Sequence, residues 1–271
     1  MVRFLSFLML AIVLVGLLAP TASYAHLSED DLIRQLEEQY GRPNPSEDKE
    51  PTTSPEEHEL PPMTMGETIQ TYLLFGYQHI LPLSADNVRA WTSGRPASVP
   101  IGWDHILFVL ALFLASAKFR PLLIQISAFT VAHTVSLALA VLGWVQVSSS
   151  IIEPLIALSI AFVAIENIYF KNITPWRPLV VFGFGLLHGL GFAGVLTSIG
   201  MPQGQFITGL ISFNVGVEVG QLSVVFLAWM IVRWFYNRPW YRSRIAVPAS
   251  ALIAAIGLFW TIERVYPLLN G

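Results

Sequence analysis

The apolar stretches of this sequence contain few side chains that can ionise, and several of those few can bind a metal ion. The candidates are Asp104, His105, His133, Glu166, His188 and Glu218. Asn214 lies four residues before Glu218, so the amide and the carboxylate would share one face of a helix. Imidazole nitrogen and carboxylate oxygen together suit Ni²⁺, Co²⁺, Zn²⁺ or Fe²⁺. These residues predict a site for a divalent metal ion, bound as substrate or ligand, and imply no prosthetic group.

Composition places these side chains in a membrane protein. Of 271 residues, 54% are hydrophobic and 12% are charged, whereas soluble domains carry about 25% charged residues. This deficit argues against a soluble enzyme. The absence of cysteine excludes thiolate metal sites. No basic, aromatic-interleaved surface is evident, so nucleic acid is not an expected partner. The expected partners are the lipid bilayer and the metal ion.

Six apolar segments are close to the roughly 20 residues that a helix needs to cross a bilayer. They are residues 103–117, 121–143, 151–170, 178–199, 206–232 and 245–265. A shorter segment, residues 67–83, is interrupted by polar residues and is expected to be re-entrant or interfacial. The predicted fold is an all-α polytopic membrane bundle of about six transmembrane helices plus that segment. Five glycines between Gly183 and Gly194 predict close helix packing around His188.

The predicted organisation has four parts. Residues 1–25 have the basic start, apolar run and small terminal residues of a cleaved signal peptide, although an uncleaved anchor is the alternative. Residues 26–65 contain eleven acidic and three basic side chains and are expected to be largely disordered outside the membrane. Residues 66–100 form the re-entrant or interfacial segment and a loop. Residues 101–271 form the six-helix transmembrane domain.

The basic residues predict the orientation of the spans. Lys118 and Arg120 follow the first span, Lys171 and Arg177 follow the third, and four arginines between 233 and 244 follow the fifth. These alternate connections lie on one side, which the positive-inside rule assigns to the cytoplasm. The expected location is the cell (inner) membrane. Both ends of the chain would then be extracytoplasmic after signal cleavage.

Residue counting predicts the depths of the candidate ligands. At 1.5 Å per residue, His133, His188 and Glu218 lie roughly 15–21 Å from the cytoplasmic ends of their helices. Asp104 and His105 would lie at the outer mouth, and Glu166 would lie about 6 Å from the inner end. We therefore expect a ladder of ligands at three depths. The alternative is that each polar group hydrogen-bonds a neighbouring helix and orders the bundle.

Several sequence runs resemble motifs of the HupE/UreJ family of membrane proteins. They are residues 101–108, 129–134, 164–167, 187–192 and 213–218. The resemblance implies a signal peptide, about six spans, and nickel or cobalt uptake that serves hydrogenase and urease assembly. Metalloenzyme maturation proteins are then implied partners. The implied metal-handling residues are Asp104, His105, His133, Glu166, His188 and Glu218.

One family feature is displaced in this sequence. Nickel-permease members carry a histidine six positions before the Asp-His pair, where this chain has Ser98. His79, twenty-five residues before Asp104, is the candidate replacement, provided that residues 81–100 loop out. His26 would be the first residue of the mature chain, where its amine and imidazole together could chelate a metal ion.

Two functional alternatives remain beside a metal permease. His133, His188 and Glu218 could hold catalytic zinc in an intramembrane hydrolase, with Glu166 or Asp104 as general base. The protein could also be a non-transporting accessory protein whose polar groups only pack helices. A permease needs ligands at several depths, whereas an enzyme needs one compact cluster. The predicted spread of depths favours the permease and argues against an enzyme.

Overall fold

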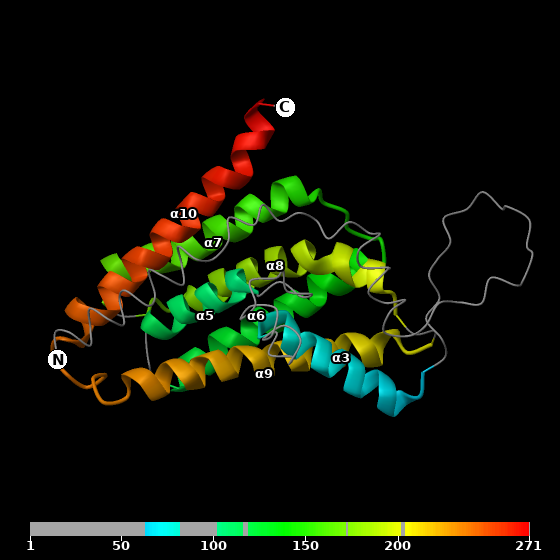
Figure 1. The fold of residues 1–271 in the computed structure, drawn as a ribbon, viewed down its shortest axis with the longest axis horizontal. Helices are drawn as coiled ribbons and strands as arrows, with labels where there is room; N and C mark the ends of the chain where they lie inside the picture. The colour runs from blue at the N-terminus through cyan, green and yellow to red at the C-terminus, as the bar shows by residue number, and fades with distance from the viewer. Residues whose placement is uncertain (1–62, 82–101, 116–118, 172, 202–203, 271) are drawn as a thin grey trace, which may run out of the picture.

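The computed structural model describes residues 63–81, 102–115, 119–171, 173–201 and 204–270, which form a bundle of helices with no strand among them (Figure 1). A π-helical turn, η1 (Arg242–Ala246), leads directly into the last helix. The predicted signal peptide and His26 lie outside the described residues. The helices are α3 (Met65–Ile80), α5 (Trp103–Ala115), α6 (Phe119–Val141), α7 (Ser149–Tyr169), α8 (Arg177–Ile199), α9 (Phe206–Val232) and α10 (Val247–Asn270).

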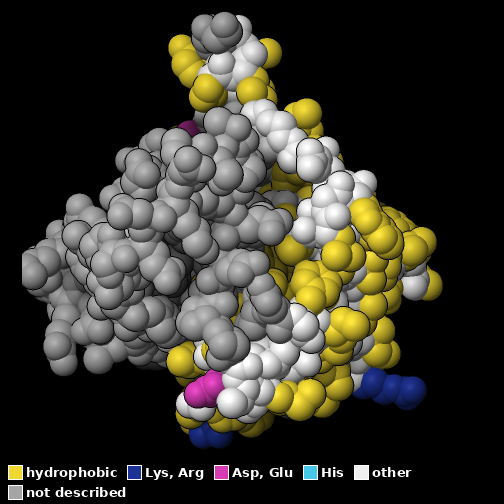
Figure 2. Space-filling view, turned by 90° about the vertical axis from the view of Figure 1, so that its right-hand side faces the viewer, with side chains coloured by type: hydrophobic (Ala, Val, Ile, Leu, Met, Phe, Trp, Pro, Cys, Tyr) yellow, Lys and Arg dark blue, Asp and Glu magenta, His cyan; other side chains and the backbone are white. Residues whose placement is uncertain are grey.

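The apolar helices make this a multi-pass membrane protein. Five of the described helices, α6 to α10, are long and apolar enough to cross a bilayer, and α5 is apolar but has only 13 residues. All six spans predicted from hydropathy are observed as helices whose ends differ by a few residues. Hydrophobic side chains cover much of the described surface in Figure 2, as helices facing lipid require. The all-α prediction is confirmed.

The connections between helices define two ends of the bundle. The α5–α6, α7–α8 and α9–α10 connections lie at one end, which we call the basic end because it carries Arg120, Lys171 and Arg238. The α6–α7 and α8–α9 connections lie at the other end, which we call the opposite end. In Figure 1 the basic end is on the left and the opposite end is on the right.

Helix α3 is fixed at its start by local hydrogen bonds. The Thr64 hydroxyl accepts a bond from the Glu67 amide, and the Glu67 carboxylate accepts one from the Thr64 amide, which forms a capping box. Farther along the helix, the Tyr72 hydroxyl donates to the Gly200 carbonyl at 2.8 Å. Because Gly200 follows α8 at the opposite end, this bond holds the first half of α3 near that end.

Glycines let α3 pack directly against α9. A side chain at Gly76 would overlap the Phe213 carbonyl, and one at Gly220 would overlap Ile80. Later residues of α3 contact later residues of α9, so the two helices run parallel. Glycine contacts of this kind let membrane helices approach closely. The sequence predicts a re-entrant or interfacial segment here, and the structure places α3 within the bundle.

The end of α3 meets the start of α5 in the middle of the bundle. A side chain at Gly102 would overlap the His79 carbonyl. The Asn167 amide donates to the Ala111 carbonyl at 2.7 Å, which places the second half of α5 beside the last turn of α7 at the basic end. Figure 1 shows α3 and α5 along different halves of the bundle's length. We call this arrangement the broken span.

Neither part of the broken span can cross a bilayer alone. The 16 residues of α3 and the 13 of α5 give lengths of about 24 and 20 Å. A bilayer core is about 30 Å thick. The two helices therefore cover the thickness between them, and their junction lies at mid-depth.

Helices α6 and α8 form a second close pair. Side chains at Gly185 and Gly189 would overlap the Phe129 and His133 carbonyls of α6. This confirms the prediction that glycines near His188 allow close packing. The result is that the middle of α8 and the middle of α6 lie almost in backbone contact.

Candidate metal centre

Four histidines from four helices converge at the junction of the broken span. His79 lies in the last turn of α3, His105 lies in the first turn of α5, and His133 and His188 lie in the middle of α6 and α8. One ring nitrogen from each of His79, His105 and His133 lies within 4.8 Å of the other two. The ring centroids of His105 and His188 are 4.8 Å apart. We call these four residues the histidine cluster.

The cluster lies in apolar surroundings. His105, His133 and His188 are buried, and His79 is half-buried. Phenylalanine rings contact the imidazoles, and they belong to Phe108, Phe129, Phe192 and Phe213. Such a shell limits the access of water to the nitrogens and lowers the local dielectric.

A hydrogen bond fixes the tautomer of His133. The Asn214 amide nitrogen donates to the Leu210 carbonyl at 2.8 Å, so the amide oxygen faces His133 Nδ1 at 2.9 Å. Nδ1 must therefore carry the proton and donate it to that oxygen. The lone pair is then on Nε2, which is buried and has no hydrogen-bond partner. This is the arrangement by which metal-binding histidines are usually oriented.

Ser159 of α7 orients His188 in the same manner. Its hydroxyl donates to the Ile156 carbonyl at 2.7 Å, which uses its only proton. The Ser159 oxygen lies 3.2 Å from His188 Nε2 and can only accept there. His188 Nδ1 consequently carries a lone pair, and this nitrogen is buried without a partner.

The other two imidazoles each have one buried nitrogen without a partner. These atoms are Nε2 of His79 and Nε2 of His105. Unpartnered buried polar atoms are rare in proteins because each costs desolvation free energy. Buried lone pairs on His133 and His188, beside two further unpartnered imidazole nitrogens, fit a Lewis acid that would accept them. Metal–nitrogen bonds of about 2.1 Å would require the rings to move slightly inward.

Two of the predicted carboxylate ligands are paired with arginines. An Arg264 nitrogen lies 3.3 Å from the Asp104 carboxylate, and an Arg177 nitrogen lies 3.5 Å from the Glu166 carboxylate. The first pair joins α5 to α10, and the second joins α7 to α8. Both pairs are largely buried. The two charges that the sequence suggests as metal ligands are thus compensated within the protein.

Glu218 also lies apart from the histidine cluster. Its carboxylate accepts a hydrogen bond from the Ser127 hydroxyl at 2.7 Å. Among the described residues, the group of acidic and histidine side chains that are close enough to share an ion contains His79, His105 and His133. The structure therefore brings together imidazoles and leaves the three carboxylates in other contacts.

The depth of the Asp104–His105 pair differs from the sequence expectation. Residue counting places it at the outer mouth, but His105 lies beside His133 and His188 at mid-depth, with ring centroids 5.9 and 4.8 Å away. Counting fails because α5 begins in the middle of the bundle, where α3 ends. The ring centroids of His79 and His105 are 4.7 Å apart, so the two histidines are in contact at the junction of α3 and α5.

Sequence reasoning missed two residues of this region. Ser159 orients His188, but a serine in an apolar helix has no distinguishing signal. Arg264 pairs with Asp104, and its signal was an arginine within the last apolar segment, where a charge needs a partner.

Comparison with known proteins identifies the family. The family described as HupE / UreJ protein matches residues 94–264, which is more than half of the chain. The chain belongs to the HupE/UreJ family. No curated protein and no solved structure matches it. The match covers α5 to α9, most of α10 and all of the histidine cluster except His79.

Membership defines the functional class of this HupE/UreJ protein. The family comprises transporter or accessory proteins associated with nickel or cobalt. The histidine cluster is compatible with such a metal-related role.

Proposed function

We propose that this protein carries a divalent transition-metal ion, with Ni²⁺ or Co²⁺ as the favoured substrate, across the inner membrane through the histidine cluster. One observation carries the proposal. Imidazoles from four helices, each with a buried nitrogen that has no partner, meet where the broken span is interrupted, and one ring nitrogen from each of His79, His105 and His133 lies within 4.8 Å of the other two. Imidazole nitrogen suits nickel, zinc, copper and iron, and the family association with nickel and cobalt favours those two ions.

A set of neutral ligands suits transport better than storage. An ion in transit must bind well enough to lose its water and weakly enough to leave. Imidazoles provide bonds but do not neutralise the double positive charge. The carboxylates that would strengthen binding are held elsewhere, by Arg264, Arg177 and Ser127. The cluster should therefore bind an ion that exchanges readily.

The broken span supplies further features of a transport site. Transporters commonly bind substrate at mid-depth, where discontinuous helices place half-helix ends beside the ion. The C-terminal end of a helix carries partial negative charge. Helix α3 ends beside the cluster, and its His79 carbonyl lies at the junction. A cation there would be attracted by the C-terminal end of α3 and by the imidazole lone pairs, which together oppose the partial positive charge at the N-terminal end of α5.

Charge distribution supports an orientation for the helices. The positive-inside rule assigns the basic end to the cytoplasm, and α3 then enters from the extracytoplasmic side. For uptake in this orientation, an ion would reach the cluster beside α3 and leave toward the basic end, where Glu166 lies. Metalloenzyme maturation proteins are the proposed recipients on that side.

The hydrolase alternative lacks its general base in the described residues. A catalytic zinc site needs a carboxylate or water-activating group close to the metal. Asp104, Glu166 and Glu218 each contact other side chains, and none shares the metal-compatible group. No specific observation favours this alternative over transport.

The test is metal uptake by the full-length protein reconstituted in proteoliposomes. Wild-type protein should accumulate Ni²⁺ or Co²⁺ above protein-free vesicles. His105→Gln should reduce uptake to the vesicle background, because it replaces a lone-pair nitrogen by an amide. His58→Gln is the matched control, since it removes an imidazole from the predicted acidic segment. Near-UV circular dichroism and gel filtration confirm that each variant is folded.

The outcomes separate the three alternatives. Uptake that depends on His105 supports the permease. Tight stoichiometric Zn²⁺ binding without uptake would instead indicate a zinc enzyme. Neither binding nor uptake by folded wild-type protein would indicate an accessory role and overturn the proposal.

A further inference from the structure

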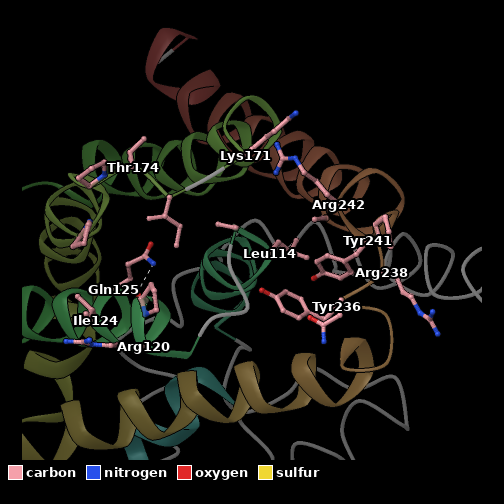
Figure 3. A pocket seen from close by; sticks show the side chains of 18 residues that line it. Leu114, Arg120, Ile124, Gln125, Lys171, Thr174, Tyr236, Arg238, Tyr241 and Arg242 are labelled. Atoms are coloured by element: carbon pink, nitrogen blue, oxygen red, sulfur yellow. Dashed lines mark hydrogen bonds between the residues drawn. The ribbon is translucent and has the colours of Figure 1, made fainter.

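A second polar site lies among the connections at the basic end. It is a pocket of about 790 Å³ that shares no residue with the histidine cluster. Its walls come from the last turn of α5, the first turns of α6, the α7–α8 connection with the start of α8, and the segment after α9 through η1 (Figure 3). Four separate parts of the sequence thus build one cavity.

The charge of the pocket has one sign. Basic side chains from three of these segments line it, and none of the described lining residues is acidic. The basic residues are Arg120, Lys171, Arg238 and Arg242. Arg242 also donates to three carbonyls at the end of α7, at 3.0 to 3.3 Å, which fixes its position. The nearby Glu166 carboxylate is occupied by Arg177 and Thr174. An anion would therefore meet uncompensated positive charge.

Two buried polar atoms of the lining have no partner. Tyr241 is 7% exposed and Gln125 is 1% exposed, and the Tyr241 hydroxyl and the Gln125 Oε1 make no hydrogen bond in the described structure. Burial raises the pKa of Tyr241 to about 12, so its hydroxyl keeps its proton and can donate. The Gln125 amide nitrogen is used by the Pro121 carbonyl, which leaves the oxygen to accept.

These two atoms complement a headgroup with both acceptors and donors. A phosphodiester oxygen would accept from Tyr241 and from the basic side chains, while a headgroup hydroxyl would donate to Gln125. In Figure 3 Gln125 lies on one side of the pocket beside Ile124, and Tyr236 and Tyr241 lie on the other side beside Arg238 and Arg242. Free phosphate could satisfy the donors but is poorly matched to an unpartnered acceptor.

The surroundings favour a lipid as the source of that headgroup. Leu114, Ile124 and several prolines line the same pocket beside the polar groups. Exposed tryptophans, Trp176 and Trp234, lie at this end, where aromatic residues typically mark the membrane interface. Basic pockets between helices at the cytoplasmic face bind the headgroups of anionic lipids.

We propose that this pocket binds the headgroup of an anionic phospholipid, one whose phosphodiester carries a free hydroxyl, drawn from the leaflet at the basic end. The glycerol headgroup of phosphatidylglycerol has this chemistry. The bound lipid would join the α7–α8 connection to the segment before α10 and stabilise the basic end of the bundle.

The experiment titrates phosphatidylglycerol into the full-length protein in mixed detergent micelles and measures the thermal unfolding midpoint and the apparent Kd. Phosphatidylcholine and inorganic phosphate are titrated in parallel. The double variant Lys171→Gln/Arg238→Gln removes two pocket charges. Arg233→Gln/Arg244→Gln is the matched control, because these arginines lie at the same end but stack on tryptophans outside the pocket lining.

Phosphatidylglycerol should raise the midpoint in the wild type. The pocket variant should weaken its apparent affinity by about tenfold, since each basic residue near an anionic surface contributes about fivefold or less, and the control should stay within about twofold. An equal loss of phosphatidylglycerol affinity in the two double variants would mean that the lipid is attracted by charge without a specific site, and it would overturn the proposal. Equal stabilisation by phosphatidylcholine would also overturn it. Saturable binding of inorganic phosphate with the same variant pattern would assign the pocket to a free anion instead.

Discussion

The histidine cluster and the pocket at the basic end both contain buried polar atoms without partners, but the charges around those atoms differ. In the cluster they are imidazole nitrogens with no basic side chain among them, and hydrogen bonds leave a lone pair on that nitrogen in His133 and His188. In the pocket they are a phenol donor and an amide acceptor among four basic side chains. The first arrangement complements a cation, and the second complements an anion that also carries a hydrogen-bond donor. The charge of a missing ligand can therefore be inferred from the unpartnered atoms together with the charges that surround them.

The carboxylates explain how the two sites stay distinct. Asp104 and Glu166 are each neutralised by an arginine from another helix. This leaves neither a fixed negative charge in the cluster nor one in the pocket lining. If either pair opened, the nearer site would change its charge and its ligand preference.

The largest expected effect comes from removing two lone pairs. His105→Gln/His133→Gln should weaken Ni²⁺ or Co²⁺ affinity by more than about 100-fold, because loss of a single outer hydrogen-bond partner already costs about 10–100-fold. Phosphatidylglycerol affinity should remain within about twofold of wild type. Isothermal titration of both ligands checks this. A parallel loss of lipid affinity would show that the two sites are not independent.

The next effect tests the orientation of His133. Asn214→Leu removes the acceptor of its Nδ1 proton, so the ring can change tautomer or rotate, and metal affinity should fall by about 10–100-fold. Ser223→Ala is the matched control on α9, because Ser223 is half-buried and its hydroxyl bonds only within its own helix. Metal titration of both variants is the measurement. Unchanged affinity in Asn214→Leu would refute the role of this hydrogen bond.

The helices of this protein were largely predictable from the sequence. Apolar runs of span length must form helices in lipid because the backbone has no other hydrogen-bond partner there. The six predicted spans accordingly match α5 to α10 within a few residues. The broken span was harder to recognise, because α3 is short and its polar residues resemble those of an interfacial segment. Its close contact with α9 depends on Gly216 and Gly220, which hydropathy does not detect.

The candidate site was predictable by residue type but not by geometry. His105, His133 and His188 were recognisable because imidazoles are rare in spans. Their grouping was not, because depth was counted from helix ends and α5 begins at mid-depth. The partner of Asp104 lies 160 residues away on α10. A single sequence gives no information on which helices meet, so Asp104 resembled a metal ligand.

A smaller effect of opposite sign is expected at the pair beside the cluster. Arg264→Gln frees the Asp104 carboxylate, which directly precedes His105, so Ni²⁺ should bind about tenfold more tightly, equivalent to about 1.4 kcal/mol. Uptake should become slower, because a more tightly bound ion leaves less readily. Arg264→Lys keeps the charge and serves as the control. Weaker binding in Arg264→Gln would mean that the arginine supports the site rather than masking a ligand.

The smallest expected effect concerns one hydroxyl in the pocket. Tyr241→Phe should weaken phosphatidylglycerol affinity by about threefold, because a neutral hydrogen bond contributes about 0.5–1.5 kcal/mol. Tyr169→Phe is the control, since Tyr169 is 78% exposed and lies outside the pocket lining.

The same hydroxyl predicts how lipid binding depends on pH. Burial raises the pKa of Tyr241 to about 12, so the hydroxyl remains a donor at pH 10, where a free tyrosine is half ionised. The ratio of the wild-type and Tyr241→Phe affinities should therefore stay constant from pH 7 to about pH 10. A ratio that falls toward one over this range would mean that the phenol ionises normally and is not buried beside the lipid phosphate.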